Sequence, residues 1–166
     1  HNKDLCVTKT SYGVIGVDFN KGFVSVSETD KCGNLINTFN INYRYSKGRQ
    51  TTNDFQYIAT KLKDYCLNTG KDLVIEKLNF KKKKDGLISK KGKKYNEMLS
   101  SLAYSKFDSI ITSKCVKNRI FLHKVNPAWT SWIAKQKYCP KMKLNIHSGA
   151  SYVIARRGMS LTDKIK

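Results

Sequence analysis

Two acidic residues, Asp18 and Glu76, occupy similar places in the sequence. Asp18 follows the run GVIGV and Glu76 follows LVI, so each carboxylate comes late in a segment typical of a buried strand. A buried carboxylate is costly unless a cation or several hydrogen-bond donors meet it. Two carboxylates brought together repel each other, and a divalent ion such as Mg²⁺ or Mn²⁺ is their natural bridge. In a basic protein this chemistry predicts phosphodiester hydrolysis with two metal ions roughly 4 Å apart.

Each acid also has an ordinary structural explanation. Asp18, followed by Asn20, is typical of a turn in which the carboxylate accepts backbone amide hydrogens. Glu76 would then be a strand-end acid paired with Lys77 or Lys71. The sequence leaves both explanations open, because neither acid taken alone distinguishes a structural role from a site.

The charge of the chain is strongly positive. Its 166 residues contain 32 Lys and Arg against 12 Asp and Glu, a formal net charge of +20. This excess goes beyond what solubility requires and favours a polyanionic partner, most often nucleic acid. An anionic membrane surface is the competing explanation, but no apolar run approaches 18 residues in length. We therefore expect a nucleic-acid partner and no membrane.

The cysteines give no sign of a disulfide framework or a zinc site. Their number is odd, they are widely spaced and they form no C-x-x-C pair. They are Cys6, Cys32, Cys66, Cys115 and Cys139. A reducing cytoplasm fits this pattern. The first residue, His1, and the lack of a secretory signal predict a processed protein or a piece of a larger one.

The first part of the chain alternates short apolar segments with turns. Residues 12–18, 23–27 and 35–41 are predicted as three strands of an antiparallel meander. A helix is predicted after the capping sequence TTND, because apolar residues then repeat at helical spacing: Phe55, Ile58, Ala59, Leu62 and Cys66. Residues 71–78 are predicted as a fourth strand, with Glu76 near its end.

The second part continues with helices and strands. Segment 79–94 holds eight lysines and is predicted as a basic loop. Residues 95–118 fit a long helix, 119–125 a further strand and 147–158 a final helix. The long helix is expected to bury Met98, Leu99, Leu102, Ala103, Ile110 and Ile111.

This order of elements predicts one α/β domain over residues 1–166, with a mixed sheet flanked by helices. Right-handed crossovers in such a sheet can bring the first and fourth strands side by side. Asp18 and Glu76 would then meet at one edge of the sheet, where loops and ligands usually gather.

Four stretches of the chain, in the expected order, resemble the nuclease part of a known family. GVIGVDFNKGFVSVSETDKCGN resembles the first RuvC motif of RNase H-like nucleases, and LVIEKLNF resembles the second. KVNPAWTSWIAKQKY is similar to the strand and Thr-Ser turn of accessory transposases of the TnpB (OrfB) type, and HSGASYVIARRGMS to their last helix. The resemblance covers residues 12–159.

The resemblance implies an RNase H-like (RuvC-type) fold and metal-dependent cleavage of DNA strands with Mg²⁺ or Mn²⁺. In full-length relatives an RNA encoded beside the transposon guides the cleavage, and an additional amino-terminal half holds that RNA. Nothing in this sequence corresponds to that half. We therefore expect the nuclease domain of a longer RNA-guided protein, nucleoid-associated in a prokaryotic cytoplasm, with no small-molecule cofactor.

The third metal ligand departs from the family pattern. Many relatives carry an acid at the head of the last helix, where this chain has His147. A neutral imidazole binds Mn²⁺ acceptably and Mg²⁺ poorly, or acts as general base on the attacking water. The alternatives are that His147 only caps the helix, or that Asp163 supplies the acid. His123 falls in a strand and is expected to be structural, and the zinc-binding cysteines of many relatives are reduced to Cys139, so no zinc is expected.

Further residues are candidates for holding nucleic acid. Eight lysines of the basic loop would attract a phosphate backbone without base specificity. They are Lys81, Lys82, Lys83, Lys84, Lys90, Lys91, Lys93 and Lys94. Thr130 and Ser131 either bind a phosphate or cap a turn. Trp129, Trp132 and Tyr138 either stack on unpaired bases or pack in the core or at an interface, and packing is favoured.

The leading hypothesis is therefore a RuvC-type endonuclease domain in which Asp18, Glu76 and His147 bind one or two divalent ions and hydrolyse DNA. The alternative is a catalytically inactive nucleic-acid-binding module with the same fold and a metal site broken by loss of the third acid. A third hypothesis, a basic RNA-binding or ribosome-associated protein, predicts that Asp18 and Glu76 lie far apart.

The role of the basic loop is testable by charge removal. Replacing Lys81, Lys82, Lys83 and Lys84 with glutamine should weaken binding of single-stranded DNA, because fewer counterions are released on binding. If all four contact phosphates, the slope of log affinity against log salt concentration falls by about 3. Fluorescence anisotropy over a series of salt concentrations measures the slope, and an unchanged slope excludes this loop as a phosphate contact.

Overall fold

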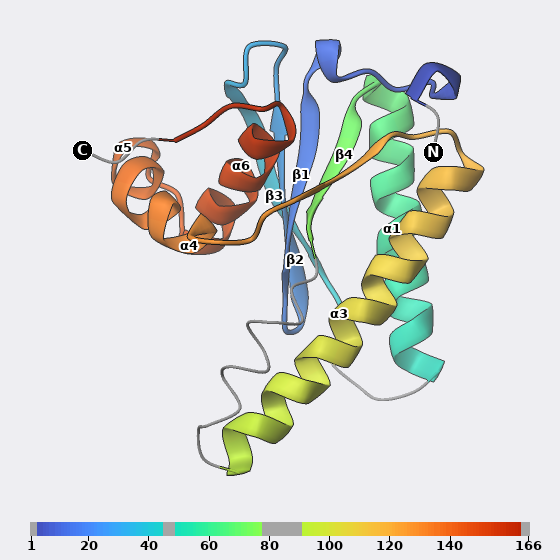
Figure 1. Ribbon diagram of the computed structural model, residues 1–166, viewed down its shortest axis with the longest axis vertical. Helices are drawn as coiled ribbons and strands as arrows, with labels where there is room; N and C mark the ends of the chain where they lie inside the picture. The colour runs from blue at the N-terminus through green and yellow to red at the C-terminus, as the bar shows by residue number, and fades with distance from the viewer. Residues whose placement is uncertain (1–2, 45–48, 78–90, 164–166) are drawn as a thin grey trace.

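The fold has three layers, with a five-strand sheet in the middle. The computed structural model describes residues 3–44, 49–77 and 91–163, without the side chains of 49–50 and 91–100. Helices α1 (Arg49–Thr69) and α3 (Lys91–Lys117) lie on one side of the sheet, and α6 (Ile146–Gly158) lies on the other (Figure 1). The predicted α/β class, with a mixed sheet flanked by helices, is confirmed.

The sheet combines an antiparallel meander with two parallel strands. Its strands are β1 (Val14–Asn20), β2 (Phe23–Thr29), β3 (Leu35–Asn42), β4 (Asp72–Glu76) and β5 (Leu122–Val125). They lie in the order β3-β2-β1-β4-β5, with β1, β2 and β3 antiparallel and β1, β4 and β5 parallel. The prediction that the first and fourth strands are neighbours is therefore confirmed.

Short helical segments complete the fold. They are the 3₁₀ turns η1 (Lys3–Leu5) and η2 (Thr10–Tyr12), helix α4 (Thr130–Ile133), the π-helical turn η4 (Ala134–Tyr138) and helix α5 (Cys139–Met142). The last three follow one another directly and pack beside α6 (Figure 1). Among the described residues, no helix is long and apolar enough to cross a membrane.

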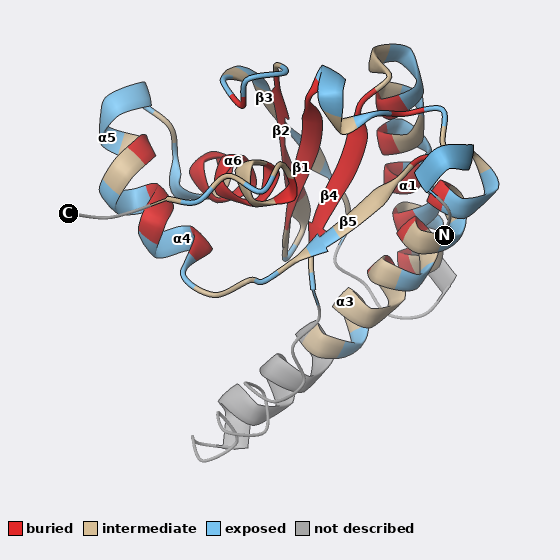
Figure 2. Ribbon diagram, turned by 45° about the horizontal axis from the view of Figure 1, so that its top comes forward, coloured by how far each residue is buried: buried red, intermediate tan, exposed pale blue. Residues whose placement is uncertain are grey.

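The main core lies between the sheet and α1. All five apolar residues predicted for the inner face of α1 are buried, as the helical spacing required. They pack against inward-facing strand residues: Ile15, Val17, Val24, Val26, Leu73 and Ile75. Figure 2 shows β1, β2, β4 and α6 as the most continuously buried elements.

Helix α3 differs from its prediction in start and in inner face. It begins at Lys91 rather than at residue 95, since lysine is a good helix former and Gly92 alone does not stop the helix. Leu102 was expected in the core but is 62% exposed, and Phe107 and Cys115 are buried although they were not predicted to be. Ile111 is buried as predicted, and Ala103 and Ile110 are partly buried against the core. The prediction for Met98 and Leu99 lies outside the described side chains.

The second layer boundary, between α6 and the sheet, is unusually close. An added Cβ at Gly16 of β1 would lie 2.5 Å from the Ser151 carbonyl oxygen and 2.6 Å from the Ala155 Cβ. At Gly158 of α6 it would lie 2.2 Å from a methyl of Val74 in β4. Glycine on both sides therefore lets α6 approach the backbone of the sheet.

Replacing Gly16 with alanine tests this approach. The added methyl overlaps α6 backbone, so we expect the free energy of unfolding to fall by about 1–3 kcal/mol, measured by urea denaturation. Gly22→Asn, in the turn of the same hairpin, measures backbone strain without steric overlap, because a Cβ there meets only the Tyr43 carbonyl oxygen at 3.9 Å but the φ of +88° strains any side chain. A Gly16→Ala protein as stable as the wild type would contradict the close packing of α6.

Candidate active site

The pairing of β1 with β4 sets the two acids opposite each other. The ladder pairs Ile15 with Leu73 and Gly16 with Val74. Continuing that parallel register by two residues sets Asp18 opposite Glu76, the last residue of β4. Register and strand length alone therefore bring the acids together, although 58 positions separate them in the sequence.

Both acids also face the same side of the sheet. Gly16 and Val74 contact α6, because a Cβ on Gly16 would touch that helix and Val74 packs on Gly158. Side chains alternate along a strand, so residues two positions further on face the same way. Asp18 and Glu76 therefore lie on the α6 side of the sheet.

The structure also corrects two expectations about these acids. Asp18 does not end its strand or form a turn, because β1 runs on to Asn20 and pairs Asp18 with Ser25. Asn20 Nδ2 donates hydrogen bonds to Asp18 Oδ2 at 2.9 Å and to its carbonyl oxygen at 3.1 Å. The suggested partner of Glu76, Lys71, is bound to another acid, described below. The ordinary explanations are thus weakened for both residues.

The third residue, His147, reaches the pair from the start of α6. Its Nδ1 lies 3.4 Å from Asp18 Oδ2, and its ring packs edge-on against Phe23 at 5.0 Å between centroids. It does not cap the helix, because Asn145 does so by accepting a hydrogen bond from the Ser148 amide. The imidazole is 44% exposed and is held between a carboxylate and an aromatic edge.

The electrostatics of the pair are unfavourable without a cation. Burial, and to a smaller extent the Asp18 charge, raise the pKa of Glu76 to about 7, against the opposing effects of Arg157 and of a hydrogen bond from Thr130. Burial likewise raises the pKa of Asp18, against the effects of Asn20 and His147. Both acids therefore hold their protons more tightly than free carboxyls, which is the condition that a bound cation relieves.

The donor set fits a hard divalent ion of the Mg²⁺ type. Within residues 3–44, 49–77 and 91–163, no set of three or more His, Cys, Asp or Glu is grouped tightly enough to cage a metal. Mg²⁺ does not need such a cage, because it commonly binds through one or two carboxylates, waters and substrate phosphates. Asp18 and Glu76 supply those two carboxylates.

Several residues near Glu76 belong to segments that the sequence analysis did not predict to be close to it. The Tyr104 hydroxyl of α3 donates to the Glu76 carbonyl oxygen. The hydroxyl of Thr130, buried at the start of α4, is placed to donate its one proton either to the Pro127 carbonyl oxygen, at 3.3 Å, or to the Glu76 carboxylate. Arg157 donates to the Asn126 carbonyl oxygen and faces Glu76 electrostatically. Only the crossover of α6 beneath β4 brings Arg157 there, so no sequence signal identifies it.

Other predicted residues lie away from the pair or outside the described residues. Ser131 is exposed on α4. Asp163 binds Lys137, Tyr138 and Arg156 rather than the carboxylates. The side chains of the eight loop lysines are not described, although Lys91, Lys93 and Lys94 belong to the first turn of α3 and not to a loop.

His123 has the structural role expected of it. In β5, its Nε2 lies 2.8 Å from Asp72 Oδ2 and 3.3 Å from Thr10 Oγ1. Asp72 is fully buried, and these contacts lower its pKa against the effect of burial. His123 therefore satisfies a buried acid at the start of β4.

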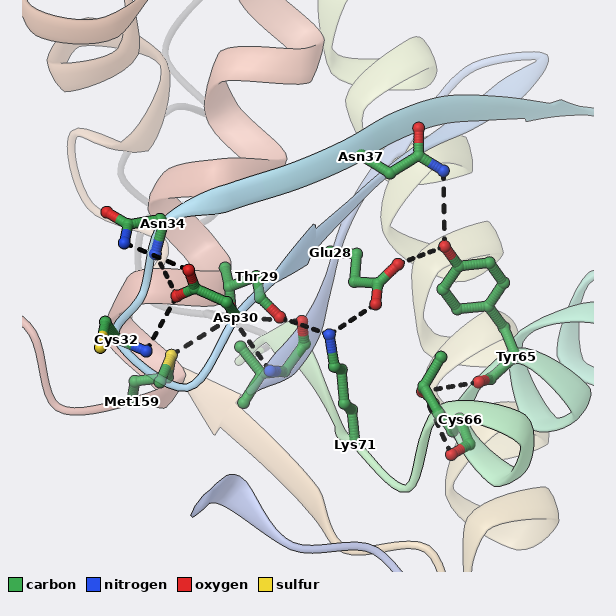
Figure 3. A network of polar contacts seen from close by, with 12 residues as sticks. Glu28, Thr29, Asp30, Cys32, Asn34, Asn37, Tyr65, Cys66, Lys71 and Met159 are labelled. Carbon is green, nitrogen blue, oxygen red and sulfur yellow. Dashed lines mark hydrogen bonds and ion pairs between the residues drawn. The ribbon is translucent and has the colours of Figure 1, made fainter. Parts of the chain in front are cut away.

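A second buried ion pair lies at the opposite end of the sheet (Figure 3). Lys71 Nζ donates to Glu28 Oε2 and, at 2.7 Å, to the Thr29 carbonyl oxygen. The Tyr65 hydroxyl donates to the other oxygen of Glu28 and accepts from Asn37 at 3.4 Å. Here the buried acid has its own cation and donors, in contrast to Glu76.

Comparison with known proteins adds no assignment: no family model matches the chain, and no curated protein matches it. The functional argument therefore rests on the residues and their arrangement.

The raised pKa of Glu76 predicts a pH-dependent stability. The folded state binds the Glu76 proton more tightly than the unfolded state, so ionisation of Glu76 destabilises the fold. This destabilisation is absent below pH 4.5, grows between pH 4.5 and about 7, and is complete above pH 7. Between pH 4.5 and 7.5, in chelator, Glu76 should thus remove about 2–3 kcal/mol from the free energy of unfolding.

Urea denaturation of wild type and Glu76→Gln at both pH values tests this contribution, because the variant lacks the titrating carboxyl group. Glu76→Gln should not show this fall in the free energy of unfolding between pH 4.5 and 7.5. At pH 7.5, Mn²⁺ should raise the free energy of unfolding of the wild type more than that of the variant. The same pH dependence in both proteins would show that Glu76 carries no penalty.

Proposed function

We propose that the chain is a RuvC-type endonuclease domain with an RNase H-like fold, related to the TnpB (OrfB) accessory transposases, that hydrolyses DNA strands with Mg²⁺ or Mn²⁺. The observation that carries the proposal is that Asp18 and Glu76 lie on the same face of adjacent parallel strands. The Asp18 charge helps to raise the pKa of Glu76, and the Arg157 charge does not offset that rise. The mixed sheet, with a hairpin meander first and parallel crossovers after it, is compatible with that fold.

The reaction assigns separate tasks to the three residues. A divalent ion held by Asp18 and Glu76 would neutralise the phosphate and activate water. Asp18 also orients His147, because a carboxylate facing Nδ1 favours the tautomer with its proton on that nitrogen. Nε2 is then left as an acceptor, and His147 is the candidate base for the attacking water.

Charge supports a nucleic acid as the substrate. The net charge of +20 far exceeds that needed for solubility, and the basic segment 79–94 follows Glu76 directly in the sequence. A guide RNA, held by further parts of a longer protein, belongs to the proposal through the family resemblance. The basic segment would hold the phosphate backbone close to the carboxylates.

A second candidate function is an inactive nucleic-acid-binding module. The observation that favours it is that no group of three metal-ligating side chains occurs among the described residues, with His147 in contact with Asp18 instead. Such a module binds DNA through the same basic surface but does not cut it. Cleavage of single-stranded DNA over a titration of Mg²⁺ and of Mn²⁺ separates the two candidates.

Substitution of Asp18 tests the catalytic assignment. Asp18→Asn keeps the side-chain shape and removes the charge, so cleavage should fall at least a hundredfold while DNA binding stays equal or becomes tighter. Asp64→Asn is the matched control, because it removes the same charge from an exposed site on α1. Gel assays of strand cleavage and anisotropy of binding give the two readouts. An Asp18→Asn protein that cuts like the control would exclude Asp18 as a ligand.

A further inference from the structure

An open aromatic pocket lies beside α4. It has a volume of about 440 Å³ and is lined by Trp129, Trp132, Ile133 and Asp163. The two indoles meet edge to face, with centroids 5.9 Å apart, yet Trp129 is 69% and Trp132 48% exposed. Neither indole is packed in the core of this chain, whereas Tyr138 is buried.

One residue that lines the pocket, Trp129, has a strained backbone conformation. Trp129 adopts the left-handed conformation, with φ of 68°, immediately before α4. A bulky residue rarely adopts this conformation, since it crowds its Cβ against the backbone. The chain thus accepts both a strained residue and exposed apolar surface at one place, which is typical of a binding surface.

The pocket also contains an unsatisfied acceptor. The Asp163 side chain is only 2% exposed, and its Oδ1 accepts from Lys137 Nζ and Arg156 Nε at 3.1 Å each and from the Tyr138 hydroxyl. Its Oδ2 is buried and has no hydrogen-bond partner among the described residues. A buried, unpaired carboxylate oxygen normally calls for a donor.

These features together specify the chemistry of an occupant. Two cations already balance the charge of Asp163, so its Oδ2 requires a hydrogen-bond donor and not a further cation. The exposed indole faces require a flat π-system, on which base stacking is strong and sequence-tolerant. A nucleobase with an exocyclic amino group offers both.

We propose that this pocket binds one unpaired nucleobase of the nucleic-acid strand, stacked on Trp129 or Trp132, with its amino-bearing edge donating to Asp163 Oδ2. Cytosine, adenine and guanine carry such an amino group. Thymine and uracil present an N–H flanked by two carbonyl oxygens, which the carboxylate repels. The pocket therefore binds cytosine more tightly than thymine.

The pocket and the candidate active site are contacted by neighbouring residues of the sequence. Trp129 directly precedes Thr130, whose side chain bonds Glu76. A base held here would fix the strand a short distance from the carboxylates. The identity of the strand as nucleic acid rests on the proposed function, while the pocket itself rests on its own contacts.

Tryptophan fluorescence tests the pocket selectively, because the chain contains only these two tryptophans. In chelator, so that no cleavage occurs, an octamer of deoxycytidine should quench the emission of the wild-type protein. An abasic octamer of equal charge should bind without quenching. Free cytidine, which needs no phosphate contact, should also quench at higher concentration.

Variants then assign the binding to named groups. Trp132→Ala should weaken binding of the deoxycytidine octamer about tenfold to a hundredfold, whereas Tyr57→Ala, an exposed aromatic on α1, should leave it unchanged. Asp163→Asn should abolish the preference for deoxycytidine over thymidine octamers. Because Asp163 is buried among ion pairs, the exposed Trp132 keeps the test decisive if that variant does not fold.

The outcomes distinguish this pocket from the proposed nuclease function. If octamers bind equally to wild type and Trp132→Ala without quenching, the pocket proposal is overturned and the nuclease proposal is not. If no octamer binds to any variant but cytidine quenches the wild type, the pocket stands and the nuclease proposal fails.

Discussion

The fold depends on the close contact between α6 and the two central strands. Glycine at 16 and 158 removes the side chains that would separate helix from sheet. Ser27 and Ser151 share a hydrogen bond across the same boundary at 2.5 Å, and Ser27 also donates to the Ser148 carbonyl oxygen. Since His147 stands in the first turn of this helix, the same contact fixes its distance from Asp18. The packing of α6 and the geometry of the site therefore depend on the same contact. A change that moves α6 away from the sheet also moves His147 away from Asp18 and Glu76.

The buried acids of this chain differ in how their charge is compensated. Glu28 has Lys71 and Tyr65, Asp72 has His123 and Thr10, and Asp163 has two cations and a tyrosine. Each of these acids thus has a cation or a hydrogen-bond donor of its own, although Asp72 Oδ1 and Asp163 Oδ2 have no hydrogen-bond partner among the described residues. Glu76 instead faces Asp18, and Arg157 and Thr130 do not compensate, so its pKa stays near 7. Asp18 and Glu76 therefore differ from these three acids, because they set two carboxylates together and no neighbour offsets the rise in the pKa of Glu76; this is the physical basis of the functional proposal.

Much of this arrangement follows from local sequence, and the rest does not. The helical spacing of Phe55, Ile58 and Leu62 requires a buried face, and the turn residues after Asn20 require a hairpin, so these elements were predictable. The extension of β1 past Asp18 was not, because it depends on pairing with β2. The exposure of Leu102 and of the two tryptophans was not predictable for a related reason. Hydrophobicity and spacing show that a residue can be buried, but only the neighbours that tertiary structure supplies decide whether it is buried, and these three side chains are exposed.

The third residue of the proposed site is a histidine, His147, and not a third acid, and this bears on how the site would work. A third carboxylate beside Asp18 and Glu76 would add to a repulsion that already raises the pKa of both acids. A neutral imidazole adds none, and when protonated it attracts them. An imidazole is a weaker ligand than a carboxylate for Mg²⁺, which prefers oxygen, and the difference is smaller for Mn²⁺. Asp18 faces Nδ1 of a half-exposed ring and leaves Nε2 as the other nitrogen, so His147 is suited to moving a proton. In the proposed nuclease, this one side chain would therefore favour Mn²⁺ over Mg²⁺.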